Sequence, residues 1–524
     1  MTAPPADASL TAARRARELA GLAEPAVGGA RFVDLLVVGL GATGAGVALD
    51  AASRGLSVVA VDAHDLAFGT SRFSSKLIHG GLRYLASGQV GVAHESAVER
   101  GLLMRAVAPH LVRAHPFVLP LTPLVSRRQG AVIRAGLEAG DLLRAAARTP
   151  RATLPAPRRI SAAETLSLAP GLRPHGLRGG LLSWDGQLAD DARLVTAIAR
   201  TAAAHGARVL TRVRALTVTG DGAELRDELT GRTFEVRARA VVNAAGVWAG
   251  GLVGDVRLLP SRGTHLVLRA AALGGLSAGL HIPVAGATSR FVLVLPQDDG
   301  RVYVGLTDEP ADGPVPDVPE APETDIGFLL DILGSALDVP VHRADVVGAF
   351  AGLRPLLAPG AADAVDGTAD ISRRHAVLAS SDGVTTVVGG KLTTYRRMAQ
   401  DAVDRAVAVR GLTAGPCRTA RLPLVGAAAP AELAGLDAPR RLVRRYGTEA
   451  PAVHALGAAD PALREPVAPG AGVTGAELLW AVRHEGALDE ADLLDRRTRV
   501  GLVPADRAAA LDAARAALAH ERDR

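Results

Sequence analysis

"VDLLVVGLGATGAGVALDAASRGLSVVAVDA" (Val33–Ala63) predicts a strand, a glycine turn, a helix and a second strand. The first strand is apolar throughout, as a parallel strand buried on both faces should be. Gly39, Gly41 and Gly44 follow it in G-x-G-x-x-G spacing, which permits a tight turn, a close pyrophosphate and close helix packing. The free N–H groups and the positive end of the helix dipole favour a pyrophosphate at this turn.

The second strand of this unit ends at Asp62, which is placed to accept hydrogen bonds from ribose hydroxyls. An acidic residue here argues against a 2′-phosphate and therefore against NADP. The motif alone leaves NAD and FAD open. A glycine-rich turn without a ligand is the plain structural alternative, but strand, helix, strand and acid all fall where nucleotide binding needs them.

Composition narrows the class of protein. A chain of 524 residues should form two or three domains, and its net charge of +5 with no basic tract argues against a nucleic-acid partner. The single cysteine, Cys417, excludes an intrachain disulfide and a multi-cysteine metal site, and no metal is expected. No apolar run is long enough to span a bilayer. Residues 1–31 lack an apolar signal-peptide core and are expected to be a flexible tail with one weak helix.

A second segment favours FAD over NAD. "ARAVVNAAGVWAGGL" (Ala238–Leu252) is a strand that runs into the small residues Ala245 and Gly246 at a tight turn, and it follows a strand that carries Val213. In flavoproteins such a strand returns to the first sheet beside the dinucleotide. A purely structural turn would have the same sequence features.

The only two lysines of the chain stand in glycine-flanked motifs, Lys76 in "SSKLIHGGLRYL" and Lys391 in "VVGGKLTTYRRM". Elsewhere the chain uses arginine for positive charge. A compact ammonium group fits a crowded site that a planar guanidinium cannot enter. The alternative interpretation is that the two lysines have escaped replacement by arginine at these positions by chance.

Together these segments resemble the FAD-dependent glycerol-3-phosphate dehydrogenases, within the D-amino-acid-oxidase-like flavoproteins. The resemblance also rests on "DGQLADDARLV", "RGTHLVL", "GLRPL" and "HEGALDEADLLDRRTRVGL", in the family's order from Gly41 to Leu502. Two departures are Leu40, where the family often has glycine, and Asp62, where glutamate is common.

The resemblance implies which residues contact the cofactor. Ser75 and Lys76 would contact the phosphates, His79 and Gly80 would lie near the flavin ring, and a loop before the helix "TYRRMAQDAVDRAV" would pass its pyrimidine side. Including the motif residues above, the expected cofactor-binding set is Gly39, Gly41, Gly44, Asp62, Ser75, Lys76, His79, Gly80, Val213, Ala245, Gly246, Gly389, Gly390, Lys391, Leu392 and Thr393.

The implied reaction is oxidation of sn-glycerol 3-phosphate to dihydroxyacetone phosphate by hydride transfer to FAD. His265 is the expected base; the alternative interpretation is that this histidine is a structural residue of the core. Arg354 would hold the developing alkoxide, and Lys391 would face the reduced flavin. The expected substrate-binding set is Arg83, Tyr84, Arg354 and Arg373, and Arg374 could replace its neighbour.

We expect an α/β fold with a Rossmann-like FAD-binding domain assembled from residues 32–110, 180–255 and 345–410. An α+β substrate-binding (cap) domain with an antiparallel sheet is expected from residues 111–179 and 256–344, and a helical C-terminal domain from residues 411–524. The proline-rich segment "PADGPVPDVPEAPETD" is expected to be a surface loop. The basic segments "RRLVRRYG" and "DRRTRVG" are expected on a solvated face, with lipid or a partner subunit as alternatives.

The expected electron acceptor is a membrane quinone, which implies a cytoplasmic protein in peripheral contact with the inner face of the cell membrane. A homodimer is a further expectation. Three alternatives stay open: an oxidase that reduces oxygen, a flavoenzyme for another alcohol or amine, and a regulatory or RNA-modifying flavoprotein. The arginine residues argue against the second alternative, and the dispersed charge and single cysteine argue against the third.

Overall fold

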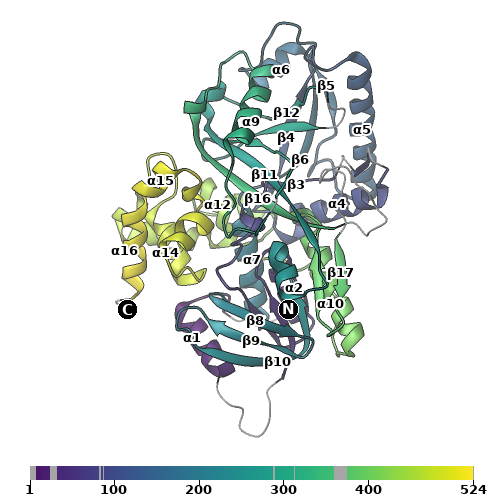
Figure 1. Ribbon diagram of the computed structural model, residues 1–524. Coiled ribbons are helices and arrows are strands. Elements are labelled where there is room, and N and C mark those ends of the chain that lie inside the picture. Colours follow the sequence, from purple (N-terminus) through teal and green to yellow (C-terminus); the bar gives the residue numbers. More distant parts are fainter. Residues whose placement is uncertain are drawn as a thin grey trace.

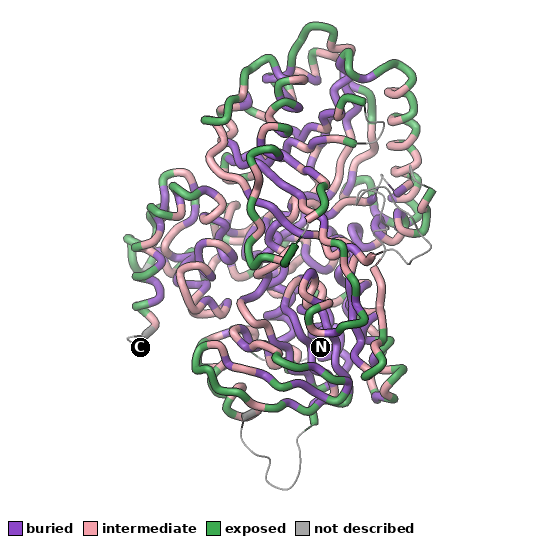
Figure 2. The backbone as a smooth tube through the Cα atoms, in the orientation of Figure 1, coloured by how far each residue is buried: buried purple, intermediate pink, exposed green. Residues whose placement is uncertain are grey.

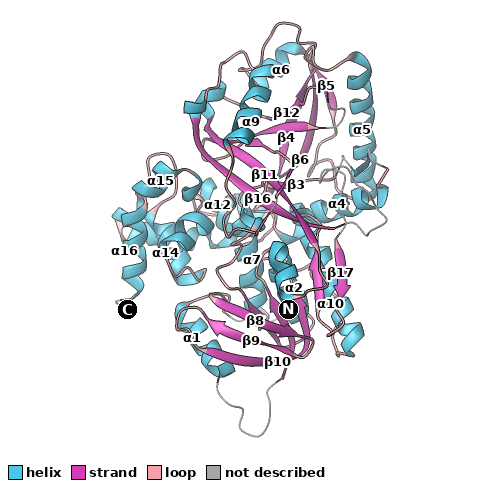
Figure 3. Ribbon diagram, viewed as in Figure 1, coloured by secondary structure: helices cyan, strands magenta, loops and turns pink. Residues whose placement is uncertain are grey.

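The computed structural model describes residues 7–23, 32–81, 84–85, 88–286, 290–311, 313–358 and 375–522. Two sheets dominate the fold, one above the other in Figure 1, and the last helices of the chain lie to one side of both. Figure 3 shows that helices flank both sheets and that the C-terminal part is helical. The expected α/β class with a helical C-terminal region is confirmed.

The first sheet contains the glycine turn. Its order is β17-β18-β10-β1-β2-β7, and a β8–β9 hairpin extends β10. β1 pairs in parallel with β2 on one side and with β10 on the other. The strands are β1 (Phe32–Val38), β2 (Val58–Val61), β7 (Arg208–Leu210), β8 (Val213–Thr219), β9 (Gly222–Asp227), β10 (Thr233–Asn243), β17 (Ala376–Ala379) and β18 (Thr385–Val388).

The apolar sequence of β1 explains its central place. Leu35, Leu36 and Val37 are fully buried, and each such side chain stabilises the fold by about 1.5–3 kcal/mol. The helices α2 (Ala42–Ser53), α7 (Asp191–Ala204) and α10 (Tyr395–Arg410) contribute to the same core. Small residues let them approach, because a Cβ at Gly46 would lie 3.1 Å from the Ala399 Cβ. Figure 2 shows this buried core in the lower half of the molecule.

The second sheet is mostly antiparallel, in the order β15-β11-β14-β13-β12-β4-β6-β3, and β16 pairs with β11. Helix α9 (Glu323–Ala336) packs on one face of this sheet and α5 (Arg127–Ala146) lies beside it. The strands are β3 (Leu77–Ile78), β4 (Val112–Pro120), β5 (Arg158–Ile160), β6 (Gly180–Leu188), β11 (Leu258–Arg269), β12 (Gly279–Pro283), β13 (Phe291–Pro296), β14 (Arg301–Gly305), β15 (Glu309–Pro310) and β16 (Val346–Leu357).

Three strands lie in a different sheet from the one expected. The sequence assigned β3, β6 and β16 to the nucleotide-binding part. In the structure β3 pairs with β6, β6 pairs with β4, and β16 pairs with β11 along its whole length. Strand pairing joins residues that are distant in the chain, so the local pattern of each strand carried no sign of its partner.

The remaining helices are α1 (Ala12–Ala23), α4 (Val90–Leu102), α6 (Ala162–Leu168), α8 (Ala249–Leu252), α11 (Pro430–Ala434), α12 (Arg440–Tyr446), α13 (Ala450–Ala459), α14 (Gly475–His484), α15 (Pro504–Ala509) and α16 (Leu511–Arg522).

The described part of the N-terminal segment is docked, which corrects the expected flexible tail. Leu10 is buried and its N–H donates to the His484 carbonyl at 3.0 Å. From α1, Arg15 donates to the carbonyl of Thr211 at 2.8 Å and pairs with Asp227. Residues 7–23 therefore join the first sheet to the C-terminal helices.

The basic segment "DRRTRVG" is also not on a solvated face. Arg497 is fully buried and donates two hydrogen bonds to Asp65, at 2.7 and 2.8 Å. The guanidinium groups of Arg497 and Arg496 hold the pKa of the Asp65 carboxyl below its usual value, although burial opposes this. A second buried pair, Arg193 with Glu485 at 2.7 Å, joins α7 to the C-terminal helices. Losing one partner of such a pair would leave a buried charge, so these contacts fix the C-terminal domain in place.

A half-buried neutral histidine should make the fold acid-sensitive. Burial lowers the pKa of His281 on β12 to about 4, while an unfolded histidine titrates near 6.5. The unfolded chain therefore binds more protons between these values, and stability falls as the pH falls. Between pH 7 and 5 this histidine should remove about 2 kcal/mol from the free energy of unfolding.

Denaturant unfolding at pH 7 and pH 5 checks this expectation. The difference between the two free energies should shrink by about 2 kcal/mol in His281→Asn relative to the parent protein. An equal pH dependence in both proteins would show that His281 is not the group responsible.

No helix in the described part of the chain is long and apolar enough to cross a membrane.

Candidate active site

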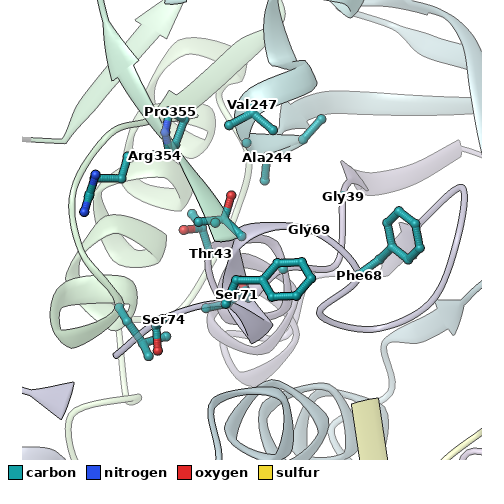
Figure 4. Close-up of a pocket in the computed structure, with 18 of the residues that line it drawn as sticks. Gly39, Thr43, Phe68, Gly69, Ser71, Ser74, Ala244, Val247, Arg354 and Pro355 are labelled. Atoms are coloured by element: carbon teal, nitrogen blue, oxygen red, sulfur yellow. The ribbon is translucent and has the colours of Figure 1, made fainter. Parts of the chain in front are cut away.

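A cavity of ≈ 790 Å³ runs from the glycine turn of the first sheet to one face of the second. At one end it is lined by residues that follow β1, β2 and β10, since the carboxyl ends of parallel strands meet at one edge. At the other end it reaches β11 and β16. Figure 4 shows Gly39, Thr43 and Ala244 on one side of this cavity and Arg354 on another.

The glycines of the turn have different structural roles. Gly39 has φ +101°, and a Cβ there would lie 2.6 Å from the Ala244 carbonyl oxygen. A Cβ at Gly44 would lie 1.8 Å from the Gly39 carbonyl oxygen, so Gly44 lets α2 pack on the turn without lining the cavity. Gly41 lines the cavity, where a Cβ would approach the Ser71 hydroxyl at 3.0 Å. The arrangement leaves space for a pyrophosphate against the start of α2.

Gly44→Ala is expected to weaken dinucleotide binding while leaving most of the fold intact. The added methyl group must displace the backbone of the turn, and a displaced turn should bind the dinucleotide at least about tenfold more weakly. Cofactor content of the purified protein and equilibrium binding measure the change. Gly136→Ala on α5 is the matched control, because a Cβ there meets nothing within 4 Å. Unchanged cofactor content in Gly44→Ala would contradict the assigned packing role.

Asp62 lies in the cavity wall directly after β2. Its carboxylate accepts from the backbone N–H groups of Leu40 at 2.7 Å and His64 at 2.8 Å. Burial raises the pKa of Asp62 to about 6, against the lowering effect of these two hydrogen bonds. The backbone of Val213 donates to the Asp62 carbonyl at 2.7 Å, so Val213 supports this strand end but does not line the cavity.

Aromatic rings border the same end of the cavity, and sequence reasoning did not single them out. His64 and Phe68 stack with ring centres 3.8 Å apart, and Trp248 lies 6.5 Å from Phe68. Asp317, from the proline-rich segment, lines the cavity and lies 3.8 Å from the His64 ring nitrogen. That segment was expected to be a plain surface loop, and nothing in its composition indicates this contact.

His265 and Arg354 face the cavity from neighbouring strands. The register of β11 and β16 pairs Ser261 with Arg354, Gly263 with Gly352, and His265 with Phe350. Because side chains alternate along a strand, these six residues share one face of the sheet. The two glycines make room for neighbouring side chains. A Cβ at Gly263 would lie 2.6 Å from an Arg354 nitrogen, and a Cβ at Gly352 would lie 2.8 Å from the Phe73 Cβ.

His265 is fully enclosed. Its Nε2 shares a hydrogen bond of 2.8 Å with the Ser75 hydroxyl, and its ring stacks on Phe350 with centres 4.8 Å apart. Burial, with smaller contributions from Lys76 and Arg354, lowers the pKa of His265 well below its usual value. The imidazole is therefore neutral at physiological pH. Ser75 was expected on the phosphates; it lines the cavity, but its hydroxyl contacts this histidine.

Arg354 is held by acceptors from β11 and from the loop between β14 and β15. It donates to the Ser261 hydroxyl at 3.0 Å, to Asp308 at 3.1 Å and to the Thr307 carbonyl at 3.2 Å. These contacts orient the guanidinium toward the cavity that it lines.

The two lysines have different surroundings. Lys391 lines the cavity, donates to the Ser96 hydroxyl, and lies 4.1 Å from the centre of the Tyr84 ring. Lys76 is fully buried, with its ammonium 2.7 Å from the Arg72 carbonyl and 3.0 Å from Asp191. The Lys76 side chain does not reach the cavity, which corrects the expected phosphate contact.

The other expected residues divide into three groups. Those that line the cavity are His79, Ala245, Gly246, Gly389, Gly390, Leu392 and Thr393, and α10 begins two residues after the last of them. Those that lie beside it are Gly80, whose N–H donates to Asp185 at 3.2 Å, and Tyr84. Arg83 and Arg373 lie outside the described residues.

Comparisons with known proteins agree with this geometry. The family model "FAD dependent oxidoreductase" matches residues 34–396, and "C-terminal domain of alpha-glycerophosphate oxidase" matches residues 417–522. "Glycerol-3-phosphate dehydrogenase 1" of Mycobacterium tuberculosis is 56% identical over 506 residues, which cover 96% of this chain and 97% of that relative. "Glycerol-3-phosphate dehydrogenase 2" of Mycobacterium bovis is 38% identical over 90% of this chain and 82% of its own length.

Two solved structures extend the comparison. The glycerol-3-phosphate dehydrogenase from Bacillus halodurans, complexed with FAD, superposes with a TM-score of 0.73 at 26% identity and covers 97% of this chain and 94% of its own. The L-alpha-glycerophosphate oxidase of Mycoplasma pneumoniae, with FAD bound, has a TM-score of 0.55 at 18% identity, covering 75% of this chain and 99% of its own. The second likeness concerns the fold alone.

Proposed function

The chain belongs to the glycerol-3-phosphate dehydrogenases of the FAD dependent oxidoreductase family, and we propose that it passes the electrons of sn-glycerol 3-phosphate to a membrane quinone. Its cofactor is FAD. One observation carries the residue assignment. His265 and Arg354 lie on one face of the β11–β16 pair, and both line the cavity that begins at the glycine turn.

The lining residues fit the shape of FAD. The start of α2 with Gly41 would hold the pyrophosphate, and Asp62 would accept from the adenosine ribose. The loop of residues 389–393 would face the pyrimidine side of the flavin ring. When bound, FAD supplies the acceptor for the hydride that leaves C2 of the substrate.

The side chains at this end of the cavity would bind the substrate oxygen and accept its proton. Neutral His265 would accept the proton of the C2 hydroxyl, and Ser75 is the group through which its Nε2 reaches that hydroxyl. Arg354 would stabilise the developing negative oxygen with fixed N–H donors. The Lys391 ammonium would add positive charge beside the flavin ring.

Anaerobic titration with sn-glycerol 3-phosphate tests the proposal. Bleaching of the flavin absorbance near about 450 nm is expected on substrate addition, followed by recovery of the colour when a soluble quinone is added. Recovery with oxygen and stoichiometric peroxide, but not with quinone, would make the protein an oxidase. Bleaching by another alcohol or amine alone would overturn the substrate.

A quinone acceptor also requires peripheral contact with the inner face of the cell membrane, and α5 offers a suitable surface. Val132 and Leu142 on α5 are 67% and 72% exposed, and Arg127 and Arg128 at its start are exposed. An exposed helix face of apolar and basic residues favours anionic lipid.

The double variant Val132→Asp/Leu142→Asp is expected to bind anionic vesicles at least about tenfold more weakly, because two apolar side chains no longer enter the lipid. Vesicle co-sedimentation measures binding, and reduction of a soluble dye should stay unchanged. Leu229→Asp/Val409→Asp removes two exposed apolar residues elsewhere and serves as the control. Equal losses in both pairs would contradict a role for α5.

A further inference from the structure

A second groove lies between the second sheet and the C-terminal helices. It has a volume of ≈ 940 Å³, and among the described residues it shares no lining residue with the active-site cavity. Residues 109–116 at the start of β4 form one side, the turn between β13 and β14 contributes Asp298, and residues 430–444 form the other side. We call it the C-terminal groove.

Positive charge is in excess in the C-terminal groove. Arg113, Arg440 and Arg444 line it, and Asp298 is the one carboxylate among its described lining residues. Asp298 pairs with Arg113 at 2.5 Å and with Arg444 at 2.7 Å. Three guanidinium groups against one carboxylate leave two positive charges uncompensated at the groove, and an anion would relieve their mutual repulsion.

The electrostatic surroundings of Arg113 agree with this excess. Burial lowers the pKa of Arg113, Asp298 opposes the change, and the charges of Arg444 and Arg440 lower it further. His110 and His115 do not add to the positive charge, because burial lowers their pKa values to about 3 and about 4. Both imidazoles are neutral at physiological pH.

Most of the other lining residues of the groove are apolar, although Ser277 and Gln297 are among them. Its walls include Pro116, Leu276, Leu433, Leu436 and Val443, from segments far apart in the chain. No aromatic side chain of Phe, Tyr or Trp is among the described lining residues, so the groove lacks the stacking surfaces that nucleobases use. A small polar anion such as the substrate would leave the apolar side chains of the groove in contact with water.

We propose that the C-terminal groove binds a phosphate-headed amphiphile, a single aliphatic chain attached to a phosphate monoester. The head group would lie between Arg440 and Arg444, whose planar forks suit phosphate oxygens. The chain would lie along Leu433, Leu436 and Val443. This site is separate from the active site, and binding there does not depend on the proposed electron acceptor.

Calorimetric titration of the FAD-loaded protein with monomeric 1-oleoyl-glycerol 3-phosphate tests the proposal. Binding at one site per chain is expected, and Arg440→Gln/Arg444→Gln should weaken it at least tenfold. Val443→Gln should also weaken it, through the aliphatic chain. Arg237→Gln/Arg405→Gln is the matched control, because it removes the same charge from exposed positions elsewhere and should not change binding. Thermal unfolding of each variant verifies that the fold is retained.

Three other results would overturn the proposal. Equal binding of mono-oleoyl glycerol, which lacks the phosphate, would indicate unspecific apolar binding. Equal affinity for inorganic phosphate would indicate a plain anion site. Binding only to phospholipid vesicles, and not to the monomeric amphiphile, would indicate a membrane-facing surface in place of a ligand site.

Discussion

His265→Asn is expected to slow anaerobic reduction of the bound FAD by sn-glycerol 3-phosphate by a factor of about 10²–10⁴, the usual contribution of a positioned base. FAD content should not change, because His265 lies on β11, in the second sheet, and not at the glycine turn. Stopped-flow absorbance at saturating substrate measures the rate directly. The variant should lower the maximal reduction rate more than it raises the substrate concentration at which half of that rate is reached.

The pH dependence adds a second test of the same residue. The pKa of His265 lies well below its usual value, and the neutral form is the active one. The reduction rate of the parent protein should therefore stay flat from pH 8 down to about 6 and fall only at lower pH. His281→Asn replaces a half-buried neutral histidine outside the described lining of the cavity, and it should retain the parent rate. A retained rate in His265→Asn would favour the core-histidine interpretation.

Arg354→Lys is expected to lower kcat/KM by a factor of about 10²–10³, although the positive charge is kept. The guanidinium makes hydrogen bonds to Ser261, Asp308 and the Thr307 carbonyl at 3.0–3.2 Å, which fix its plane. A lysine has a single ammonium on a flexible stem and cannot keep these contacts while it also faces the substrate. Steady-state kinetics with a soluble acceptor measure the loss.

Arg262→Lys is the matched control for Arg354→Lys. Arg262 also lies on the β11–β16 ribbon but faces the opposite side, where it pairs with Asp325 at 3.2 Å. This exchange should change kcat/KM by no more than a few-fold. Equal losses in the two variants would indicate that the sheet is sensitive to any change and that Arg354 has no special role.

Local sequence patterns predicted the elements of the nucleotide site. The apolar strand before Gly39, the spacing of Gly41 and Gly44, and the acid at Asp62 all follow from requirements that act within thirty residues. The structure has the same strand, turn, helix and strand, and the cavity begins at this turn. The loop before α10 was likewise predicted, and it lines the same cavity.

The sequence by itself determined which segments form strands and helices around the glycine turn, because the spacing of apolar residues and glycines acts locally. Only the tertiary structure decided how distant segments meet. It moved β6 and β16 into the second sheet, joined Lys76 to Asp191 inside the protein, and buried Arg497 against Asp65. Each of these depends on a partner far along the chain, and a buried charge is stable only when the fold brings that partner to it.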